Sequence, residues 1–442
     1  LPWGKQALER GGIWYTATSG IWQSIWLEFL PTCFVREVHV EAVWPEGSFD
    51  VAYTLDAEEP GAEAVLRFTT EGKNVAEAKV RPGSRTRIQI PEPRAWSPEQ
   101  PFLYNWELLL YSVSGTLLDR VEGYAGLRSV ALGSDAKGEP CLLLNGEVCR
   151  QAGVLDQGYW SDGLYTAPTD QALIDDILLV KSLGFNLIRK HIKIEPQRWY
   201  YHCDRLGILV WQDVVNGGRG YKAPVTQWLP FAGLKLDDKR YGLFGRGGGD
   251  REERLAAARG RSAQKAIIRE TYEALRNTVS IVLWTVFNEG WGQFDAKQVA
   301  IELKTLDPTR LVDHASGWHD QGGPDLQSLH IYFKQFKPRR DPLGRPLALT
   351  EFGGFSLPVE GHMTSDTLFG YKKFKDAADY RAAVLSLYRS EILPVRRLAA
   401  TVYTQLSDVE DEINGLITYD RRVTKWPEPE VLAGLIRQCL EP

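Results

Sequence analysis

Two glutamates each follow a run of apolar residues that is typical of a buried strand. The run that begins at Ile281 leads into Glu289, and the run that begins at Leu347 leads into Glu351. A lone glutamate at a strand end is most simply the partner of a surface salt bridge, but a matched pair can hydrolyse a glycosidic bond. One carboxyl group protonates the leaving oxygen while the other attacks the anomeric carbon. The pair therefore predicts a glycosidase.

Other predicted strand ends also carry polar side chains, which a hydroxyl-rich sugar would need as hydrogen-bonding partners. These are His191, Asp213, His330 and Tyr332. Each histidine, and Tyr332 likewise, could equally be a structural residue. Of the fifteen tryptophans, Trp291 and Trp318 lie nearest the predicted site, where an aromatic face could stack on a sugar ring. The remaining tryptophans are expected to be packing residues.

Several other chemistries are not supported by the motifs. His314 and His319 are too widely spaced, with too few companions, to predict a metal site, so neither a metal nor another cofactor is expected. Residues 245–250 are glycine-rich but lack the third glycine of a dinucleotide fingerprint. The histidine and cysteine at 202–203 fall within a predicted helix, and no Gly-x-Ser-x-Gly elbow occurs, so acyl transfer is not predicted.

The elements that must position the two glutamates are alternating strands and helices. After about residue 145, strand-like apolar runs alternate with segments of helical periodicity to the end of the chain. This alternation predicts a (β/α)8 TIM barrel, with a doubly wound sheet as the alternative. Catalytic groups of such a barrel lie at the C-terminal ends of its strands. Residues 217–262 interrupt the rhythm and are expected to form a flexible surface excursion on that face.

The segment from about residue 35 to 127 has a different pattern. Short runs of alternating polar and apolar residues are separated by turn signals such as residues 45–47 and 82–83. Strands of this length with such turns predict a β-sandwich of about 90 residues.

Composition sets the broad class of the protein. The 442 residues predict about three domains, and 43% hydrophobic with 25% charged residues is typical of a globular protein. The net charge of −5 and the lack of a long apolar run favour neither a nucleic acid nor a membrane as partner. Five scattered cysteines favour free thiols and a reducing cytosol. Because the chain starts at Leu1 and its only methionine is Met363, its natural start is expected to be missing, which leaves the compartment open.

Four motifs resemble, in chain order, the signatures of glycoside hydrolase family 2. They are residues 18–28 (Thr-Ser-Gly-Ile-Trp-Gln-Ser-Ile-Trp-Leu-Glu), 126–129 (Gly-Leu-Arg-Ser), 287–289 (Phe-Asn-Glu) and 350–353 (Thr-Glu-Phe-Gly). The resemblance implies a multidomain protein that starts with the C-terminal remnant of a jelly-roll β-domain at 1–31. An immunoglobulin-like β-sandwich would follow at 32–128 and a catalytic barrel at 129–442. It is also compatible with a homo-oligomer.

The resemblance also implies roles for individual residues. Glu289 resembles the general acid/base, Asn288 the group that binds the sugar's 2-hydroxyl, and Glu351 the nucleophile. More loosely, His191, Asp213, His330 and Tyr332 resemble residues that contact substrate or orient the nucleophile. The expected activity is a retaining exo-β-glycosidase that needs no cofactor and is most similar to a β-galactosidase.

Two alternatives stay open. A β-glucuronidase or β-galacturonidase of the family should carry an Asn-x-Lys pair for the uronate, whereas this chain has Glu412 and Asn414 at the matching place. Six basic residues could replace that lysine: Arg189, Lys190, Lys193, Arg421, Arg422 and Lys425. The other alternative is a catalytically silent carbohydrate-binding or scaffold protein, against which the presence of both glutamates argues.

Overall fold

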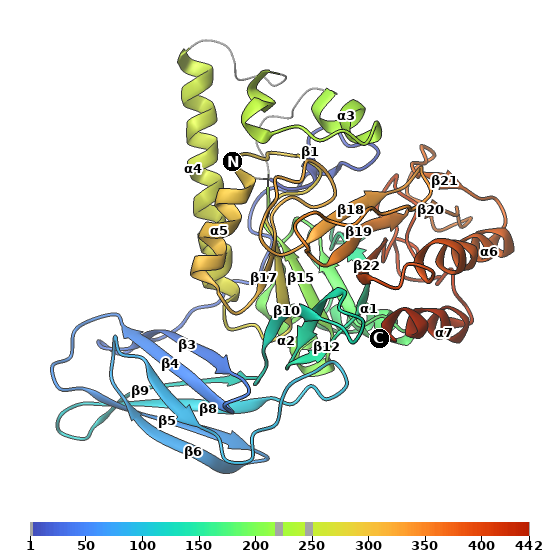
Figure 1. Cartoon of the computed structure of the whole chain (residues 1–442). Coiled ribbons are helices and arrows are strands. Elements are labelled where there is room, and N and C mark those ends of the chain that lie inside the picture. The colour runs from blue at the N-terminus through green and yellow to red at the C-terminus, as the bar shows by residue number, and fades with distance from the viewer. Residues whose placement is uncertain (1–2, 217–223, 244–250, 442) are drawn as a thin grey trace.

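A computed structural model of the chain describes residues 3–216, 224–243 and 251–441. Its central element is one sheet of eight parallel strands in the order β17-β16-β15-β14-β13-β22-β19-β18. The strands follow one another around a barrel in chain order, with β22 next to β13, and β17 and β18 lie at the two ends of the sheet. Helices surround the strands on the outside (Figure 1). The strands are β13 (Gln151–Asp156), β14 (Leu187–Lys190), β15 (Leu209–Asp213), β16 (Ile281–Thr285), β17 (Leu311–Asp313), β18 (Gln327–Ile331), β19 (Leu347–Gly353) and β22 (Leu398–Thr404).

The helices around the barrel begin and end at residues that favour those positions. The Thr169 side chain caps the first helix by accepting a hydrogen bond from the Ala172 amide, and Gly207 ends the second helix in the left-handed conformation. The helices are α1 (Asp170–Ser182), α2 (Gln197–Leu206), α4 (Arg251–Leu275), α5 (Ala296–Leu306), α6 (Ala377–Leu387) and α7 (Pro429–Leu440). Their apolar faces pack on the strands and form the largest core of the molecule.

The prediction of a flexible surface excursion at 217–262 is partly wrong. Helix α4 begins at Arg251, and the short helices η1 (Pro224–Trp228), α3 (Leu229–Phe231) and η2 (Asp238–Leu243) precede it. Residues 251–258 are Arg, Glu, Leu and Ala, all strong helix formers, so this stretch had the local propensity for a helix. The glycine-rich residues 245–250 lie outside the described part of the chain.

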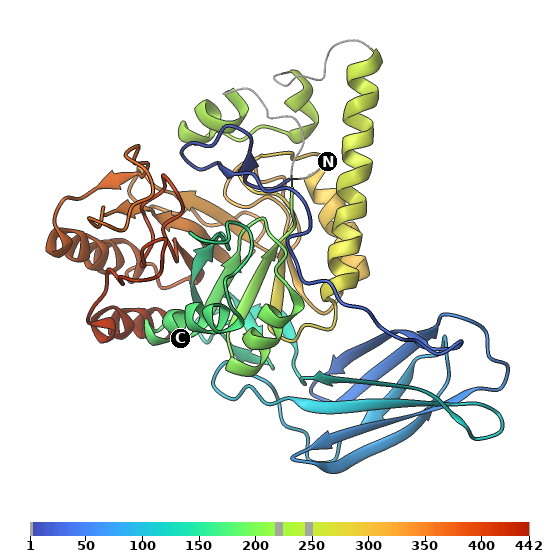
Figure 2. The ribbon, with the colours of Figure 1, turned by 180° about the vertical axis from the view of Figure 1, so that it is seen from behind.

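Two antiparallel sheets form the sandwich, and Figure 2 shows them beside one end of the barrel. The strands are β3 (Val35–Val43), β4 (Ser48–Leu55) and β7 (Thr86–Gln89) in one sheet, and β6 (Lys73–Val80), β5 (Glu63–Thr70), β8 (Tyr104–Tyr111) and β9 (Leu117–Ala125) in the other. Phe49 and Phe68 stack between the sheets with ring centroids 4.8 Å apart. A small sheet of β10 (Val130–Ser134), β11 (Pro140–Leu144) and β12 (Glu147–Val148) follows, and Leu142 and Leu144 of β11 share a core with the barrel strands.

The first residues of the chain lie on the opposite side of the barrel from the sandwich (Figures 1 and 2). Strands β1 (Gln6–Ala7) and β2 (Tyr15–Thr16) pair in parallel there. Residues 17–34 contain no strand and run back toward the sandwich, with Ile25, Trp26 and Phe29 exposed. Strands β20 (Phe355–Ser356) and β21 (Lys372–Lys373) form a further small pair.

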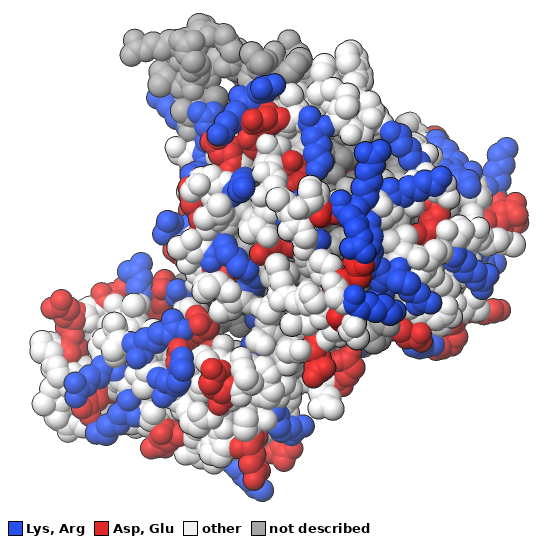
Figure 3. Space-filling view, viewed as in Figure 1, with Lys and Arg blue, Asp and Glu red and all other residues white. Residues whose placement is uncertain are grey.

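Three general features of the chain concern its helices, its cysteines and its surface charges. No helix in the described ranges is long and apolar enough to cross a membrane. All five cysteines are free, as their spacing predicts. On the face drawn in Figure 3, acidic and basic side chains are interspersed over the sandwich.

Candidate active site

Glu289 lies on a tight turn just beyond the end of β16. Its φ is +51° and that of Gly290 is +74°, so two successive residues adopt the left-handed conformation. For a residue other than glycine this costs about 1 kcal/mol and requires support from the surroundings. Here the Glu289 amide donates to the Ser316 carbonyl at 3.0 Å, and the Ser316 amide donates to the Phe287 carbonyl at 2.8 Å. These bonds fix the turn and with it the direction of the carboxylate.

Glu351 lies in β19 and receives a hydrogen bond from Tyr332. The Tyr332 hydroxyl donates to Oε2 of Glu351 at 2.5 Å, and the Tyr332 ring stacks on Tyr371 with centroids 3.9 Å apart. Tyr371 can come this close because Gly354 has no side chain: a Cβ there would lie 2.3 Å from the Tyr371 ring. The glycine thus permits the aromatic pair that holds Glu351.

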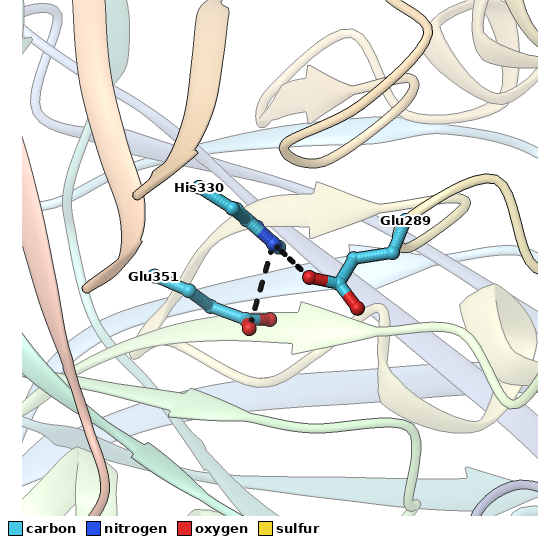
Figure 4. A group of neighbouring side chains, drawn as sticks. All are labelled: Glu289, His330 and Glu351. Carbon is cyan, nitrogen blue, oxygen red and sulfur yellow. Dashed lines mark hydrogen bonds and ion pairs between the residues drawn. The ribbon is translucent and has the colours of Figure 1, made fainter. Parts of the chain in front are cut away.

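His330 joins the two glutamates, as Figure 4 shows. Its Nδ1 lies 2.9 Å from Oε1 of Glu289 and 3.4 Å from Oε2 of Glu351. One oxygen of each glutamate and a ring nitrogen of His330 all lie within 4.8 Å of one another, and all three residues are buried. The strand ends of β16, β18 and β19 therefore bring the two predicted carboxylates together at the mouth of the barrel.

Burial shifts the pKa values of all three groups. It raises the pKa of Glu289 to about 7, although Lys5 and Arg189 oppose the rise. Burial also raises the pKa of Glu351, and His330 opposes this effect while the neighbouring Glu289 adds to it. It lowers the pKa of His330 to about 4, against the attraction of Glu351, so the imidazole is neutral near pH 7.

An ion-pair network centred on Arg189 of β14 borders the two glutamates. Its guanidinium donates to both carboxylate oxygens of Asp213 at 3.0 and 2.9 Å, to Oε1 of Glu351 at 3.2 Å and to the Asn288 side-chain oxygen at 2.9 Å. His191 Nδ1 lies 2.7 Å from Asp213. Burial opposes ionisation of Asp213, but Arg189 and His191 overcome it and lower its pKa to about 2. Asp213 is therefore a charged anchor for the arginine and for His191.

Three further predicted residues border this cluster. Asn288 accepts from Arg189 through its oxygen, and its buried amide nitrogen has no hydrogen-bond partner among the described residues. Trp318 lies beside His330, with ring centroids 6.5 Å apart. Trp291 packs edge-to-face on Trp14 at 5.1 Å. All nine predicted site residues thus lie at or next to one end of the barrel.

The two histidines judged too far apart for a metal site have structural partners. His314 Nε2 accepts from the Gln321 amide at 2.9 Å, and His319 Nε2 lies 2.6 Å from the Val225 carbonyl. In the described part of the chain, the group with the geometry to hold a metal ion is Glu289, His330 and Glu351 itself.

Sequence reasoning missed four residues of this region: Arg189 as the centre of the network, Tyr371 under Tyr332, and Lys5 and Trp14 from the N-terminal segment. Arg189 was considered only as a partner for a uronate. Five of the six basic residues considered for that role pair closely with acidic groups of this chain: Arg189 with Asp213, Lys190 with Asp156, Lys193 with Glu195, Arg421 with Asp176 and Lys425 with Asp408. The sixth, Arg422, is exposed and lies 3.9 Å from Asp420.

Comparison with known proteins finds relatives of this chain. The chain is 26% identical over 308 residues to a β-galactosidase of Lactococcus lactis, and the match covers 70% of this chain and 27% of that protein. It is 27% identical over 273 residues to a putative β-glucuronidase of Formosa agariphila, covering 60% of this chain and 23% of that one. The chain thus spans less than a third of the length of the curated relatives it matches.

Solved structures show the same fold. A β-D-glucuronidase structure from Dictyoglomus thermophilum superposes with a TM-score of 0.68 at 17% identity, covering 93% of this chain and 70% of the other. The family model "Glycosyl hydrolases family 2, TIM barrel domain" matches residues 163–425, more than half of the chain, and the model "Glycosyl hydrolases family 2" matches residues 34–128. The resemblance inferred from the motifs is confirmed: the chain belongs to glycoside hydrolase family 2.

Proposed function

We propose that the protein is a retaining exo-β-glycosidase that acts on a neutral terminal sugar, most readily a β-galactoside. The observation that carries this proposal is the placement of one oxygen each of Glu289 and Glu351 within 4.8 Å of one another. Retaining enzymes hold their carboxyl groups about 5–5.5 Å apart, whereas inverting enzymes need about 6.5–9.5 Å to admit a water molecule. The short separation supports retention.

The hydrogen bonds favour Glu351 as the nucleophile and Glu289 as the acid/base. Glu351 accepts from Arg189 and from Tyr332, and both donors stabilise an ionised carboxylate. Glu289 has no arginine partner within ion-pair distance in the described part of the chain, and its pKa of about 7 leaves a large fraction of it protonated at neutral pH. One carboxylate is thus prepared to attack and the other to donate a proton.

In the first step, Oε of Glu351 forms a bond to C1 of the sugar while the C1–oxygen bond of the leaving group breaks and Glu289 transfers its proton to that oxygen. In the second step, Glu289 takes a proton from water, the water oxygen bonds to C1, and the bond from Glu351 to C1 breaks. Arg189 and Tyr332 hold the Glu351 oxygens in place throughout.

The other predicted residues are assigned to substrate binding. The free amide nitrogen of Asn288 is a donor for the 2-hydroxyl, and Trp291 and Trp318 offer aromatic surface. His191 offers a ring nitrogen, His330 orients the two glutamates through Nδ1, and Asp213 acts by orienting Arg189. We assign residues 1–31, 32–128 and 129–442 to the jelly-roll remnant, the sandwich and the barrel, with a carbohydrate as the partner and a second copy of the chain as a further candidate.

The test compares Glu289→Ala and Glu351→Ala on a dinitrophenyl β-galactoside, whose leaving group needs little protonation. We expect Glu351→Ala to lose about 10⁴-fold or more in kcat/KM, and Glu289→Ala to retain turnover that azide accelerates. Equal inactivity of both variants without azide rescue would contradict the assignment. Failure of the wild-type protein to cleave any aryl β-glycoside would instead support the silent carbohydrate-binding alternative.

The uronidase alternative is tested on the same protein. We expect the β-galactoside to be cleaved at least about tenfold more efficiently than the β-glucuronide, because a buried uronate must pair with a cation and five of the six basic residues considered for it pair closely with acidic groups. Kinetics that favour the glucuronide would overturn the neutral-sugar assignment while leaving the two-carboxylate mechanism in place.

A further inference from the structure

His330 has a second ring nitrogen, which contacts a buried cluster of hydroxyl groups. Its Nε2 lies 3.0 Å from Oγ of Ser316, whereas its Nδ1 lies 2.9 Å from Oε1 of Glu289. Ser316, Ser328 and Thr350 form this hydroxyl cluster, and all three are buried. Because the imidazole is neutral near pH 7, only one ring nitrogen carries a proton. The nitrogen that carries it decides whether His330 donates to Glu289 or accepts from it.

A bulge in the sheet lets two consecutive residues of β19 contact this part of the site. Leu329 of β18 pairs with the residue before Thr350, and His330 pairs with Glu351, so Thr350 itself is skipped in the ladder. A bulge of this kind re-aims a side chain. Oγ1 of Thr350 lies 3.0 Å from Oγ of Ser316, while Oε2 of Glu351 lies 3.4 Å from Nδ1 of His330. The bulge thus places one residue in the hydroxyl cluster and the next beside the imidazole.

Close packing holds the imidazole ring in position. A Cβ at Gly317 would lie 2.2 Å from the His330 ring, so the backbone passes directly against it. Ser316 precedes this glycine, and its amide and carbonyl groups hold the turn that carries Glu289. Ser316 therefore contacts the acid/base turn through its backbone and His330 through its side chain. With the ring fixed, the remaining variable is the position of its proton.

The hydrogen bonds of the cluster determine that position. A hydroxyl group has one proton to donate, whereas a backbone carbonyl can only accept. The Thr350 hydroxyl donates to the Leu329 carbonyl at 3.3 Å, so Ser316 is the donor in its 3.0 Å contact with Thr350. Ser316 then has no proton left for His330. The 3.0 Å contact between Ser316 and Nε2 therefore requires the proton on Nε2.

Ser328 belongs to the cluster without controlling the ring. Its oxygen accepts from the Gly317 amide at 3.3 Å and lies 2.7 Å from Oγ1 of Thr350. It lies 3.4 Å from Oγ of Ser316, and in the described part of the chain it makes no hydrogen bond to His330. Ser328 is thus a buried hydroxyl group whose loss leaves the acceptor of the Ser316 proton in place.

We propose that the hydroxyl chain from Ser316 to Thr350 holds neutral His330 with its proton on Nε2, so that its bare Nδ1 accepts a hydrogen bond from the protonated carboxyl group of Glu289. The proposal rests on the glycosidase function proposed above and adds Ser316 and Thr350 as positioning residues for its acid/base. A bare nitrogen favours the protonated carboxyl group and disfavours the carboxylate, whose lone pairs it would face. The raised pKa of Glu289, about 7, agrees with this arrangement.

Other charged and titratable groups also face these two side chains. Around Glu289 they are Lys5, Arg189, Tyr332, Glu351 and Tyr371. Around His330 they are Arg189, Asp213, Asp313 and Glu351. The variants described below replace none of these groups. A difference between the variants therefore reports on the hydroxyl chain.

The first measurement is the nitrogen-15 NMR spectrum of histidine-labelled wild-type protein at about pH 6, where both Glu289 and the neutral imidazole keep one proton. The chain has seven histidines, and the His330→Gln variant identifies the signals of His330. A ring nitrogen that carries a proton and one that does not have well-separated resonances. We expect the proton on Nε2. A proton on Nδ1 would overturn the proposal, and this result needs no substrate.

The second measurement is the pH profile of Thr350→Val on an aryl β-galactoside. The variant keeps the size of the side chain but removes the acceptor of the Ser316 proton. Ser316 can then donate to Nε2, and the ring proton moves to Nδ1, where it stabilises the Glu289 carboxylate. We expect the alkaline limb about one pH unit lower, so that kcat/KM is about tenfold below wild type at about pH 8 and within about twofold of it at about pH 5.5.

Thr350→Ser and Ser328→Ala are the matched controls. The first keeps the accepting hydroxyl group, and the second removes a hydroxyl group that makes no hydrogen bond to His330 in the described structure. We expect both to keep the proton on Nε2 and the alkaline limb of wild type. Ser316→Ala is a second test variant: it removes the partner of Nε2 and should lower the alkaline limb as Thr350→Val does.

Two further outcomes overturn the proposal. One is an alkaline limb that stays in place in Ser316→Ala and in folded Thr350→Val, and the other is an equal shift in Ser328→Ala. If Thr350→Val does not fold, the wild-type spectrum and Ser316→Ala decide. A protein that carries the proton on Nε2 but cleaves no aryl β-glycoside overturns the glycosidase function and leaves the assignment of the His330 proton standing.

Discussion

Two buried arginines lie at opposite ends of the barrel and have opposite surroundings. Arg128, at the junction with the sandwich, donates to the carbonyls of Val279 at 2.8 Å, Ile281 at 2.9 Å and Thr309 at 3.3 Å. Arg189, at the mouth, donates to the carboxylates of Asp213 and Glu351. Both side chains are almost completely buried, so the difference between them is the chemistry of their partners.

That difference appears in the pKa values of the two arginines. Burial and, to a smaller extent, the neighbouring Arg310 lower the pKa of Arg128 to about 9. Burial acts in the same direction on Arg189, but Asp213 and Glu351 overcome it and raise its pKa above the usual value. Carbonyl dipoles can fix the position of a charge without a net charge of their own, which suits a joint between domains. Around Arg189, by contrast, the partners are charged carboxylates, and their electrostatic field can act on the charges of a reaction.

The largest effect is expected from Arg189→Met. The variant removes a donor from Glu351 and leaves Asp213 buried without its cation, so we expect kcat/KM to fall about 10³-fold, equivalent to about 4 kcal/mol in transition-state stabilisation. The control is Arg189→Lys, which keeps the charge but not the forked contacts, and should lie between wild type and Arg189→Met. Aryl β-galactoside kinetics measure both. A decrease of less than tenfold in kcat/KM for Arg189→Met would show that catalysis at the mouth does not depend on this charge.

Arg128→Met tests the other end of the comparison. Three backbone carbonyls lose a hydrogen bond from this guanidinium, although that of Ile281 keeps one from Arg310, so we expect the free energy of unfolding to fall by about 3 kcal/mol, while kcat/KM of the folded enzyme stays within about twofold of wild type. Denaturant unfolding followed by fluorescence gives the first quantity. A large change in kcat with unchanged stability would contradict the division between the two ends.

The sequence predicts the strands, most helices and the position of both glutamates, because these depend on local patterns. Apolar runs mark β16 and β19, and a polar residue directly after a barrel strand lies at its mouth. The helical periodicity expected after about residue 145 includes the segments that form α5 and α7. Helix α4 was missed before residue 263 because its first half is so polar that it is hard to distinguish from a charged loop.

Long-range pairings are what the sequence could not reveal. Arg189 pairs with Asp213 across 24 positions and with Glu351 across 162, and no periodicity encodes such distances. The same holds for Tyr15 and Glu412, which are 397 positions apart. The basic residues Arg189 and Lys190 of β14 and Lys193 just beyond it were therefore considered free for a substrate, whereas folding pairs each of them with an acidic residue of this chain.

The pH dependence of activity sharpens the comparison, since the acid/base at the mouth, Glu289, titrates near neutrality. Glu289 must be protonated to act as acid, and its pKa is about 7, so kcat/KM should fall about tenfold per pH unit above that value. The groups around Glu289 are His330, Glu351, Arg189, Lys5 and Trp291. Because Arg189 lowers the pKa of Glu289, the alkaline limb should move to higher pH in Arg189→Met and stay in place in Arg128→Met. A profile without an alkaline limb below about pH 9 would contradict the role of Glu289.

The smallest effect is expected at the joint itself, from Tyr124→Phe. The Tyr124 hydroxyl in β9 donates to Oδ2 of Asp204 at 2.9 Å, and Asp204 also accepts from the amides of Val279 at 3.1 Å and Ser280 at 2.6 Å. Because the carboxylate keeps both amide donors in the variant, we expect a loss of only about 1 kcal/mol in the free energy of unfolding, with unchanged kcat/KM. Tyr53→Phe is the matched control within the sandwich, where the hydroxyl makes a long bond of 3.4 Å to the Val80 carbonyl. If Tyr124→Phe impaired catalysis more than stability, the joint would be coupled to the mouth and the two arginines could not be treated as independent.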